Sequence, residues 1–107
     1  MSGMYDLKAV RLSARSSYVK FTDEMELAMS PQRHLNLLTA PAIVTFGTNE
    51  TPEFQRQSRE FAAAVKAAGK AVQLVEGANN NHFEMAESAG NPYGPNGRAA
   101  LALLGLI

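Results

Sequence analysis

Two short apolar runs in the second half of the chain predict two buried β-strands. The first is Ala42–Phe46 and the second is Ala71–Val75, and each is too apolar on both faces for a strand that faces water. Between them, apolar side chains recur at helical spacing and place Phe54, Phe61 and Val65 on one face of a helix. A strand, a helix and a strand in this order predict a right-handed parallel crossover.

Cap and turn residues mark the ends of this central helix. Thr51 is in position to cap it, Pro52 suits its first turn, and Gly69 suits a left-handed residue that ends it. After the second strand, residues 84–88 predict a short helix. Arg98–Leu106 predicts a final apolar helix, whose leucines, Leu101 and Leu104, are expected to pack on the sheet.

The first 40 residues show weaker periodicity. Val10–Phe21 carries many polar side chains and is expected to be irregular, with at most a short helix. Thr22 can cap a helix on which Met25 and Met29 share one face, and this pair is expected to lie in the core and not to form a ligand surface. Ser30, followed directly by a proline, marks a second helical start.

Length and pattern together predict one α/β domain over residues 1–107. Residues 1–40 form its helical and irregular cap-side segment, and residues 41–107 form a strand–helix–strand–helix unit. Two strands are marginal as a sheet and leave an unpaired edge. We therefore expect a piece of a longer protein that forms a homo-oligomer in isolation. The alternative is that helices from residues 1–40 fold over the sheet.

Composition and charge restrict the classes of partner. Ten basic and ten acidic side chains cancel, so charge gives no reason to propose nucleic acid or an anionic membrane as a partner. The absence of cysteine excludes a disulfide framework and thiolate catalysis. Zinc would have to rely on His34, His82 and carboxylates, whose spacing suggests no site, so no metal and no cofactor are expected. The longest apolar stretch, Ala99–Ile107, is too short to span a membrane, and the N-terminus lacks a signal-peptide pattern. A cytoplasmic protein is expected.

The loops that follow the two predicted strands carry the candidate chemistry. Thr48–Phe54 has Glu50 at its tip, and Glu76–Glu84 has His82 at its tip. Loops at the carboxyl ends of adjacent parallel strands lie side by side, so the Glu50 carboxylate could reach one ring nitrogen of His82. Alternatively, Glu50 is solvated and His82 is a loop histidine that bonds to a neighbouring asparagine.

An acid after one parallel strand and a histidine after the next are the last two members of a Ser–Asp/Glu–His triad in α/β-hydrolase order. The histidine takes the proton of the nucleophile, and the carboxylate holds the imidazole ring. The nucleophile elbow, Gly-x-Ser-x-Gly on a strand-to-helix turn, does not occur in the 107 residues. Ala86–Gly90 imitates it around Ser88, but this segment follows a helix and comes after the histidine. Ser88 is therefore not expected to be a nucleophile.

Four segments carry a resemblance to a known family. They are Ser2–Leu7, Ser30–Leu35, Gly47–Gln57 and Asn81–Glu84. In this order, and over essentially the whole chain, they are similar to the C-terminal part of arylformamidase (kynurenine formamidase)-type α/β-hydrolases. The resemblance implies a C-terminal βαβ-plus-helix fragment of the α/β-hydrolase fold. It also implies hydrolysis of an amide, N-formyl-kynurenine in the family, or of small carboxylic esters.

The resemblance also assigns roles to residues. The family histidine, general base and then general acid, falls on His82. The family aspartate falls on Glu50, which is one methylene longer, and Glu53 is a fallback acid. The resemblance implies an upstream segment with the serine elbow and a His-Gly-Gly oxyanion segment. Without that segment, the 107 residues are expected to be inactive alone.

A function of another class stays open at this point: a non-catalytic α/β module that acts through oligomerisation or binding. In that case His82 would be dispensable. The remaining candidates are weaker. His34 is expected to be a packing or hydrogen-bonding residue, and Tyr5-Asp6 either borders a substrate pocket or forms a structural turn.

Overall fold

The two predicted strands pair in parallel in the computed structural model, which describes residues 1–107. They are β1 (Ala42–Gly47) and β2 (Val72–Gly77), and the register sets Gly47 opposite Gly77. Both strands therefore end at the same level, and the loops that follow them begin side by side. The α/β architecture predicted from the apolar runs is confirmed.

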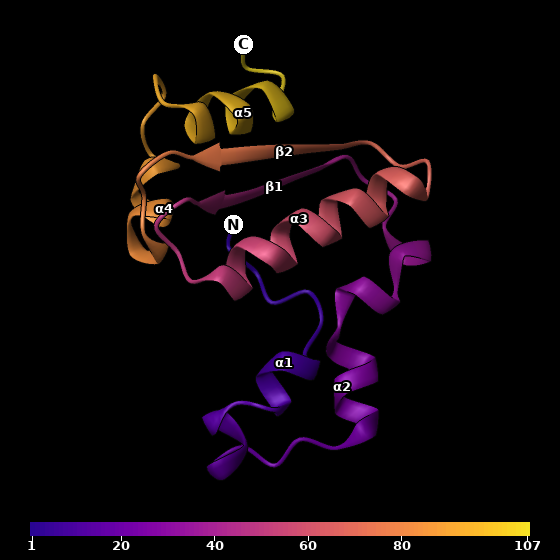
Figure 1. Ribbon diagram of the computed structural model, residues 1–107. Coiled ribbons are helices and arrows are strands. Elements are labelled where there is room, and N and C mark those ends of the chain that lie inside the picture. The colour runs from indigo at the N-terminus through magenta and orange to yellow at the C-terminus, as the bar shows by residue number, and fades with distance from the viewer.

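Helices lie on both faces of this sheet and at one end of it (Figure 1). The connecting helix α3 (Pro52–Ala67) covers one face, and α5 (Pro95–Leu103) lies over the other. The short helix α4 (His82–Ser88) lies at the carboxyl ends of the strands. No helix combines the length and the apolar character that a membrane span requires.

The outer strand β2 differs from its prediction. It continues through Glu76 to Gly77, beyond the predicted end, because both residues still pair with β1. Gln73, Leu74 and Glu76 are exposed, whereas Val75 and Gly77 are buried. The prediction that both strands are buried on both faces is therefore wrong for β2. Each strand of this sheet has one neighbouring strand, but the free side of β1 also holds the N-terminal segment, where the N–H of Ser2 donates to the carbonyl of Thr45.

The core lies between β1 and α3. Val44, Phe61, Ala62 and Val65 form one buried cluster. Tyr5, from the N-terminal segment, stacks on Phe61 with the ring centroids 4.2 Å apart and the planes 2° from parallel. The face of α3 that helical spacing predicted is thus the one that packs on the sheet.

The ends of α3 follow the sequence only in part. Gly69 has a φ of +74°, and its N–H donates to the carbonyl of Lys66. The N–H of Lys70 donates to the carbonyl of Val65, which completes a Schellman motif as Gly69 predicted. Thr51 precedes the helix in an extended conformation, but its hydroxyl makes no capping bond. The predicted Thr51 side-chain cap is therefore wrong.

The N-terminal 40 residues form short helical pieces on the far side of α3 from the sheet (Figure 1). These are α1 (Lys8–Arg11), α2 (Asp23–Met29) and three 3₁₀ turns, Ala14–Ser17, Pro31–Arg33 and Leu35–Leu37. The hydroxyl of Thr22 caps α2 as predicted by accepting from the N–H of Met25 at 3.2 Å. The last of these pieces reaches the core, since Leu35 packs against the cluster that includes Val44 of β1.

The helical start at Ser30 is confirmed, since a 3₁₀ turn begins at the following proline. The Ser30 hydroxyl makes no capping bond, however, because it donates to the carbonyl of Glu26 and accepts from the N–H of Leu7. Two other local predictions in the helical segments are wrong. Met29 is exposed instead of sharing a buried face. Leu104 does not pack on the sheet: α5 spans Pro95–Leu103, one turn earlier than predicted, and Leu104 follows its end and is exposed.

Candidate functional site

The loops after β1 and β2 are tied to each other by hydrogen bonds. The N–H of Thr48 donates to the carbonyl of Gly77 at 3.1 Å, and the N–H of Asn49 donates to the carbonyl of Asn80 at 3.0 Å. The Asn49 side chain donates to the carbonyl of Asn79, and the N–H of Asn79 donates to the Thr48 hydroxyl. The parallel register thus continues into the loops and holds them in contact.

Glycine at the end of β1 permits this close approach. A Cβ placed on Gly47 would lie 2.1 Å from the carbonyl oxygen of Asn80, well inside van der Waals contact. Across the pair, a Cβ on Gly77 would lie 2.5 Å from the sulfur of Met85 in α4. The two glycines that end the strands therefore let the second loop and α4 pack directly on the first loop.

His82 is the first residue of α4, so its prediction as a loop-tip residue is corrected. Asn81 caps the helix: its side-chain oxygen accepts from the N–H groups of Phe83 and Glu84, each at 3.0 Å. The Glu84 carboxylate accepts from the N–H of Asn81 in return, which completes a capping box. The start of a capped helix therefore fixes the backbone of His82.

The structure brings the two candidate residues into contact. His82 Nδ1 lies 2.6 Å from Glu50 Oε1. The Glu50 side chain is fully buried, whereas the His82 side chain is 46% exposed. The ring of Phe54 lies against the imidazole, with the centroids 4.4 Å apart. Of the two alternatives from the sequence, the imidazole bonds to the acid and not to a neighbouring asparagine, which leaves Nε2 without a hydrogen-bond partner in the chain.

The Glu50 carboxylate is held from both sides. Its Oε2 accepts from the N–H of Gly47 at 2.6 Å and from the hydroxyl of Ser2 at 2.7 Å, and its Oε1 faces His82. Burial alone would raise the pKa of Glu50, but the hydrogen bonds from Gly47, Ser2 and His82, with the charge of a protonated His82, outweigh it and lower the pKa below its usual value. Glu50 is therefore an anion at neutral pH.

This lowered pKa predicts how a Glu50→Gln variant responds to acid. The pKa of Glu50 is lower in the folded chain than in the unfolded chain, so the ionised carboxylate stabilises the fold at every pH above the unfolded-state pKa. This stabilisation is lost as the pH falls through the folded-state pKa. We expect Glu50→Gln to lower the free energy of unfolding by about 1–3 kcal/mol at pH 7, and by less at pH 3. Urea denaturation at both pH values measures this difference.

The matched control is Glu87→Gln, at an exposed glutamate near the end of α4. This variant is expected to change the free energy of unfolding by at most about 0.5 kcal/mol at either pH. An equal destabilisation by Glu50→Gln at pH 7 and pH 3 would contradict the ionised, hydrogen-bonded carboxylate.

Two other sequence candidates are engaged elsewhere. The guanidinium of Arg56 donates to both carboxylate oxygens of Glu53 and holds the pKa of Glu53 below its usual value. Glu53 is therefore not the partner of His82. The hydroxyl of Ser88 donates to the carbonyl of Met85 and accepts from the Asn96 amide at 2.6 Å. Ser88 occupies the last turn of α4 and not a strand-to-helix turn.

Neither His34 nor the Tyr5-Asp6 turn bonds to His82 or Glu50, although the charge of Glu50 contributes, after burial, to raising the pKa of Tyr5. Nε2 of His34 donates to the carbonyl of Leu27 at 2.6 Å, within the N-terminal helical pieces. The Gln57 side chain accepts from the N–H groups of Tyr5 and Asp6 and donates to the Asp6 carbonyl, so this turn is fastened to α3. No group of three or more metal-ligating side chains gathers in the structure.

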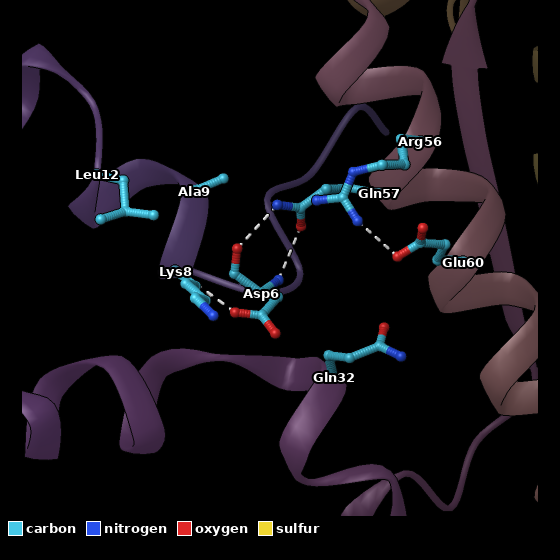
Figure 2. A pocket seen from close by; sticks show the side chains of 8 residues that line it. All are labelled: Asp6, Lys8, Ala9, Leu12, Gln32, Arg56, Gln57 and Glu60. Carbon is cyan, nitrogen blue, oxygen red and sulfur yellow. Dashed lines mark hydrogen bonds and ion pairs between the residues drawn. The ribbon is translucent and has the colours of Figure 1, made fainter.

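A cavity of about 430 Å³ lies beside this turn, between α1 and α3 (Figure 2). Its lining is mostly polar and includes Asp6, Lys8, Arg56 and Glu60. The Arg56 guanidinium in its wall is already paired with Glu60. The cavity contains neither Glu50 nor His82, so it is not part of the candidate site.

Ser2 is the site residue that sequence reasoning missed. Only 6% of it is exposed, its hydroxyl donates to Glu50, and its N–H donates to the carbonyl of Thr45 on the open side of β1. Its φ is +45°, in the left-handed region that non-glycine residues rarely adopt. Ser2 is far from Glu50 in the sequence, so no local spacing could have indicated this contact.

Two curated proteins match the chain. A kynurenine formamidase of Danio rerio is 32% identical over 92 residues, which cover 81% of this chain and 31% of that protein. A kynurenine formamidase of Salmo salar is 30% identical over 93 residues, which cover 81% of this chain and 32% of that protein. No protein-family model matches the chain, and no solved structure matches it significantly.

The chain thus spans about a third of the length of the curated relatives it matches. The resemblance predicted from the four sequence segments is confirmed for a partial chain.

Proposed function

We propose that this chain, which is related to kynurenine formamidases over about a third of their length, forms part of a serine hydrolase. The proposed hydrolase cleaves the carbon–nitrogen bond of a small formamide, or a small carboxylic ester. The observation that carries the proposal is the 2.6 Å contact between His82 Nδ1 and Glu50 Oε1, at the carboxyl ends of adjacent parallel strands. His82 is the general base and then the general acid, and Glu50 is the acid that orients it.

The geometry suits these roles step by step. A carboxylate can only accept a hydrogen bond, so the Nδ1 that faces Glu50 carries the proton of the neutral imidazole. The lone pair is then on Nε2, on a ring that is 46% exposed and can be reached by a hydroxyl nucleophile. When Nε2 takes the nucleophile's proton, the imidazolium is stabilised by the buried anion of Glu50. Nε2 then gives this proton to the leaving nitrogen or oxygen.

The nucleophile and the oxyanion donors are proposed to come from a segment outside these 107 residues. The position of Ser2 supports this proposal, because Ser2 lies on the open side of β1 and its N–H donates to the carbonyl of Thr45. A strand that leads into Ser2 would extend the sheet beside β1, as in an α/β-hydrolase fold to which these residues contribute the C-terminal part. By itself the chain is expected to be inactive, to associate with copies of itself through its open strand edges, and to be cytoplasmic.

A chimera tests the proposed activity. It joins the portion of the Danio rerio protein that this chain does not match to the 107 residues described above. We expect the chimera to hydrolyse N-formyl-kynurenine, and the Danio rerio portion alone to be inactive. A folded chimera without turnover would contradict the proposed activity and favour a non-catalytic module.

The 107-residue chain provides a second test. Treated with a fluorophosphonate probe, it is expected to keep its intact mass and to turn over neither a formyl-anilide nor an aryl acetate. Labelling together with turnover would place an activated serine within these residues and overturn the proposed external nucleophile.

A further inference from the structure

The hydroxyl of Ser2 has a contact that neither the sequence resemblance nor the proposed roles explain. It donates to Glu50 Oε2 at 2.7 Å, whereas His82 lies against Oε1 of the same carboxylate. A glutamate side chain has three torsions, and freezing them costs conformational entropy. The donors on Oε2, Ser2 and the N–H of Gly47, determine which way Oε1 points.

The backbone of Ser2 is unusual for a residue with a side chain. Its φ of +45° is one that glycine adopts without a steric penalty and serine does not. The N–H bond to Thr45 and the 6% exposure show that Ser2 is built into the fold. A glycine would fit this backbone more easily, so the hydroxyl is the feature that a serine adds here.

We propose that Ser2 is a positioning residue of the His82–Glu50 site, whose hydroxyl fixes the Glu50 carboxylate so that its other oxygen holds His82 in the Nδ1–H tautomer. Its role in catalysis rests on the proposed function, because Ser2 acts on the reaction only through Glu50 and His82. The effect of Ser2 on the Glu50 carboxylate and on the His82 imidazole does not require catalysis. The positioning effect and its consequence for catalysis can therefore be measured separately.

The first test uses nuclear magnetic resonance on the 107-residue chain. In Ser2→Gly the backbone keeps its conformation and the hydroxyl is lost. We expect the pKa of Glu50, followed by its carboxyl ¹³C shift, to rise above that of the unaltered chain. We also expect the ratio of Nδ1–H to Nε2–H tautomer in neutral His82, read from the ¹⁵N shifts, to fall at least about twofold, because a freed carboxylate orients the ring less strictly. Ser2→Ala, which keeps the Cβ, is expected to give the same two changes.

The matched control is Ser30→Ala. Ser30 is fully buried and its hydroxyl makes two hydrogen bonds, but these go to Leu7 and Glu26 and not to the site. We expect this variant to leave the Glu50 pKa and the His82 tautomer unchanged even where it lowers stability. If both Ser2 variants are folded, as judged by their amide spectra, and leave both values unchanged, the positioning role is overturned.

The second test uses the chimera. Ser2→Gly is expected to lower kcat about tenfold with KM unchanged, the fold-change that corresponds to one lost hydrogen bond to a charged group. Ser30→Ala is expected to leave both kcat and KM of the chimera unchanged. An unaltered chimera without activity would contradict the proposed hydrolase, whereas the resonance measurements would still decide the role of Ser2. An active chimera whose kcat is unaffected by Ser2→Gly would overturn the role of Ser2 alone.

Discussion

Replacing His82 by alanine in the chimera is expected to lower kcat by about 10³-fold or more, because the change removes the group that takes and returns the proton. No neighbour can substitute for it. Glu50 is buried behind the ring, and Glu53 is paired with Arg56. The measurement is hydrolysis of N-formyl-kynurenine under saturating substrate, with KM determined alongside.

The matched control for this prediction is the other histidine of the chain. His34 bonds to the carbonyl of Leu27 among the N-terminal helical pieces and lies outside the site. His34→Ala is expected to keep kcat within about twofold, and thermal unfolding of both variants checks that each is folded. An active chimera in which His82→Ala retains the unaltered kcat would eliminate His82 as the base.

The parts of the fold that local pattern determines were predictable from the sequence. The apolar run of β1, the buried face of α3 and the left-handed Gly69 each depend on neighbours a few residues away. The proximity of Glu50 and His82 was predictable for a related reason. In a parallel crossover the loops that follow adjacent strands lie side by side, and in this chain both strands end at the same level, with Gly47 opposite Gly77.

The misses have a common physical cause, which is that tertiary contacts decided them. Leu74 of β2 is exposed although the run around it is apolar, because burial depends on what packs over a side chain and not on the composition of its own strand. The hydroxyl of Ser30 bonds to Leu7 and Glu26, partners that no helix-start pattern indicates. Ser2 joins the site through a contact that spans nearly half of the chain. Contacts of this kind can be read from a three-dimensional structure but not from spacing.

Substituting Gly47 by alanine is expected to have the largest effect on the geometry of the site. The added Cβ would lie 2.1 Å from the carbonyl oxygen of Asn80, which is backbone and cannot rotate away. The loops must therefore separate. Their separation breaks the bonds that join Thr48 and Asn49 to the second loop and withdraws His82 from Glu50. We expect a loss of about 3 kcal/mol in the free energy of unfolding, at the upper end of overpacking effects.

Gly69→Ala separates this clash from the general cost of replacing a glycine. Gly69 has a φ of +74° and open space around its Cα, so alanine there strains the end of α3 without touching the site. It is expected to cost about 1 kcal/mol and to leave the Nδ1–H tautomer of His82 in place. Gly47→Ala is expected to lose that tautomer as well as stability. If the two variants prove equally stable and share the His82 tautomer of the unaltered chain, the contact of the two loops does not depend on Gly47, and the site must be held by Ser2 and the Asn81 cap instead.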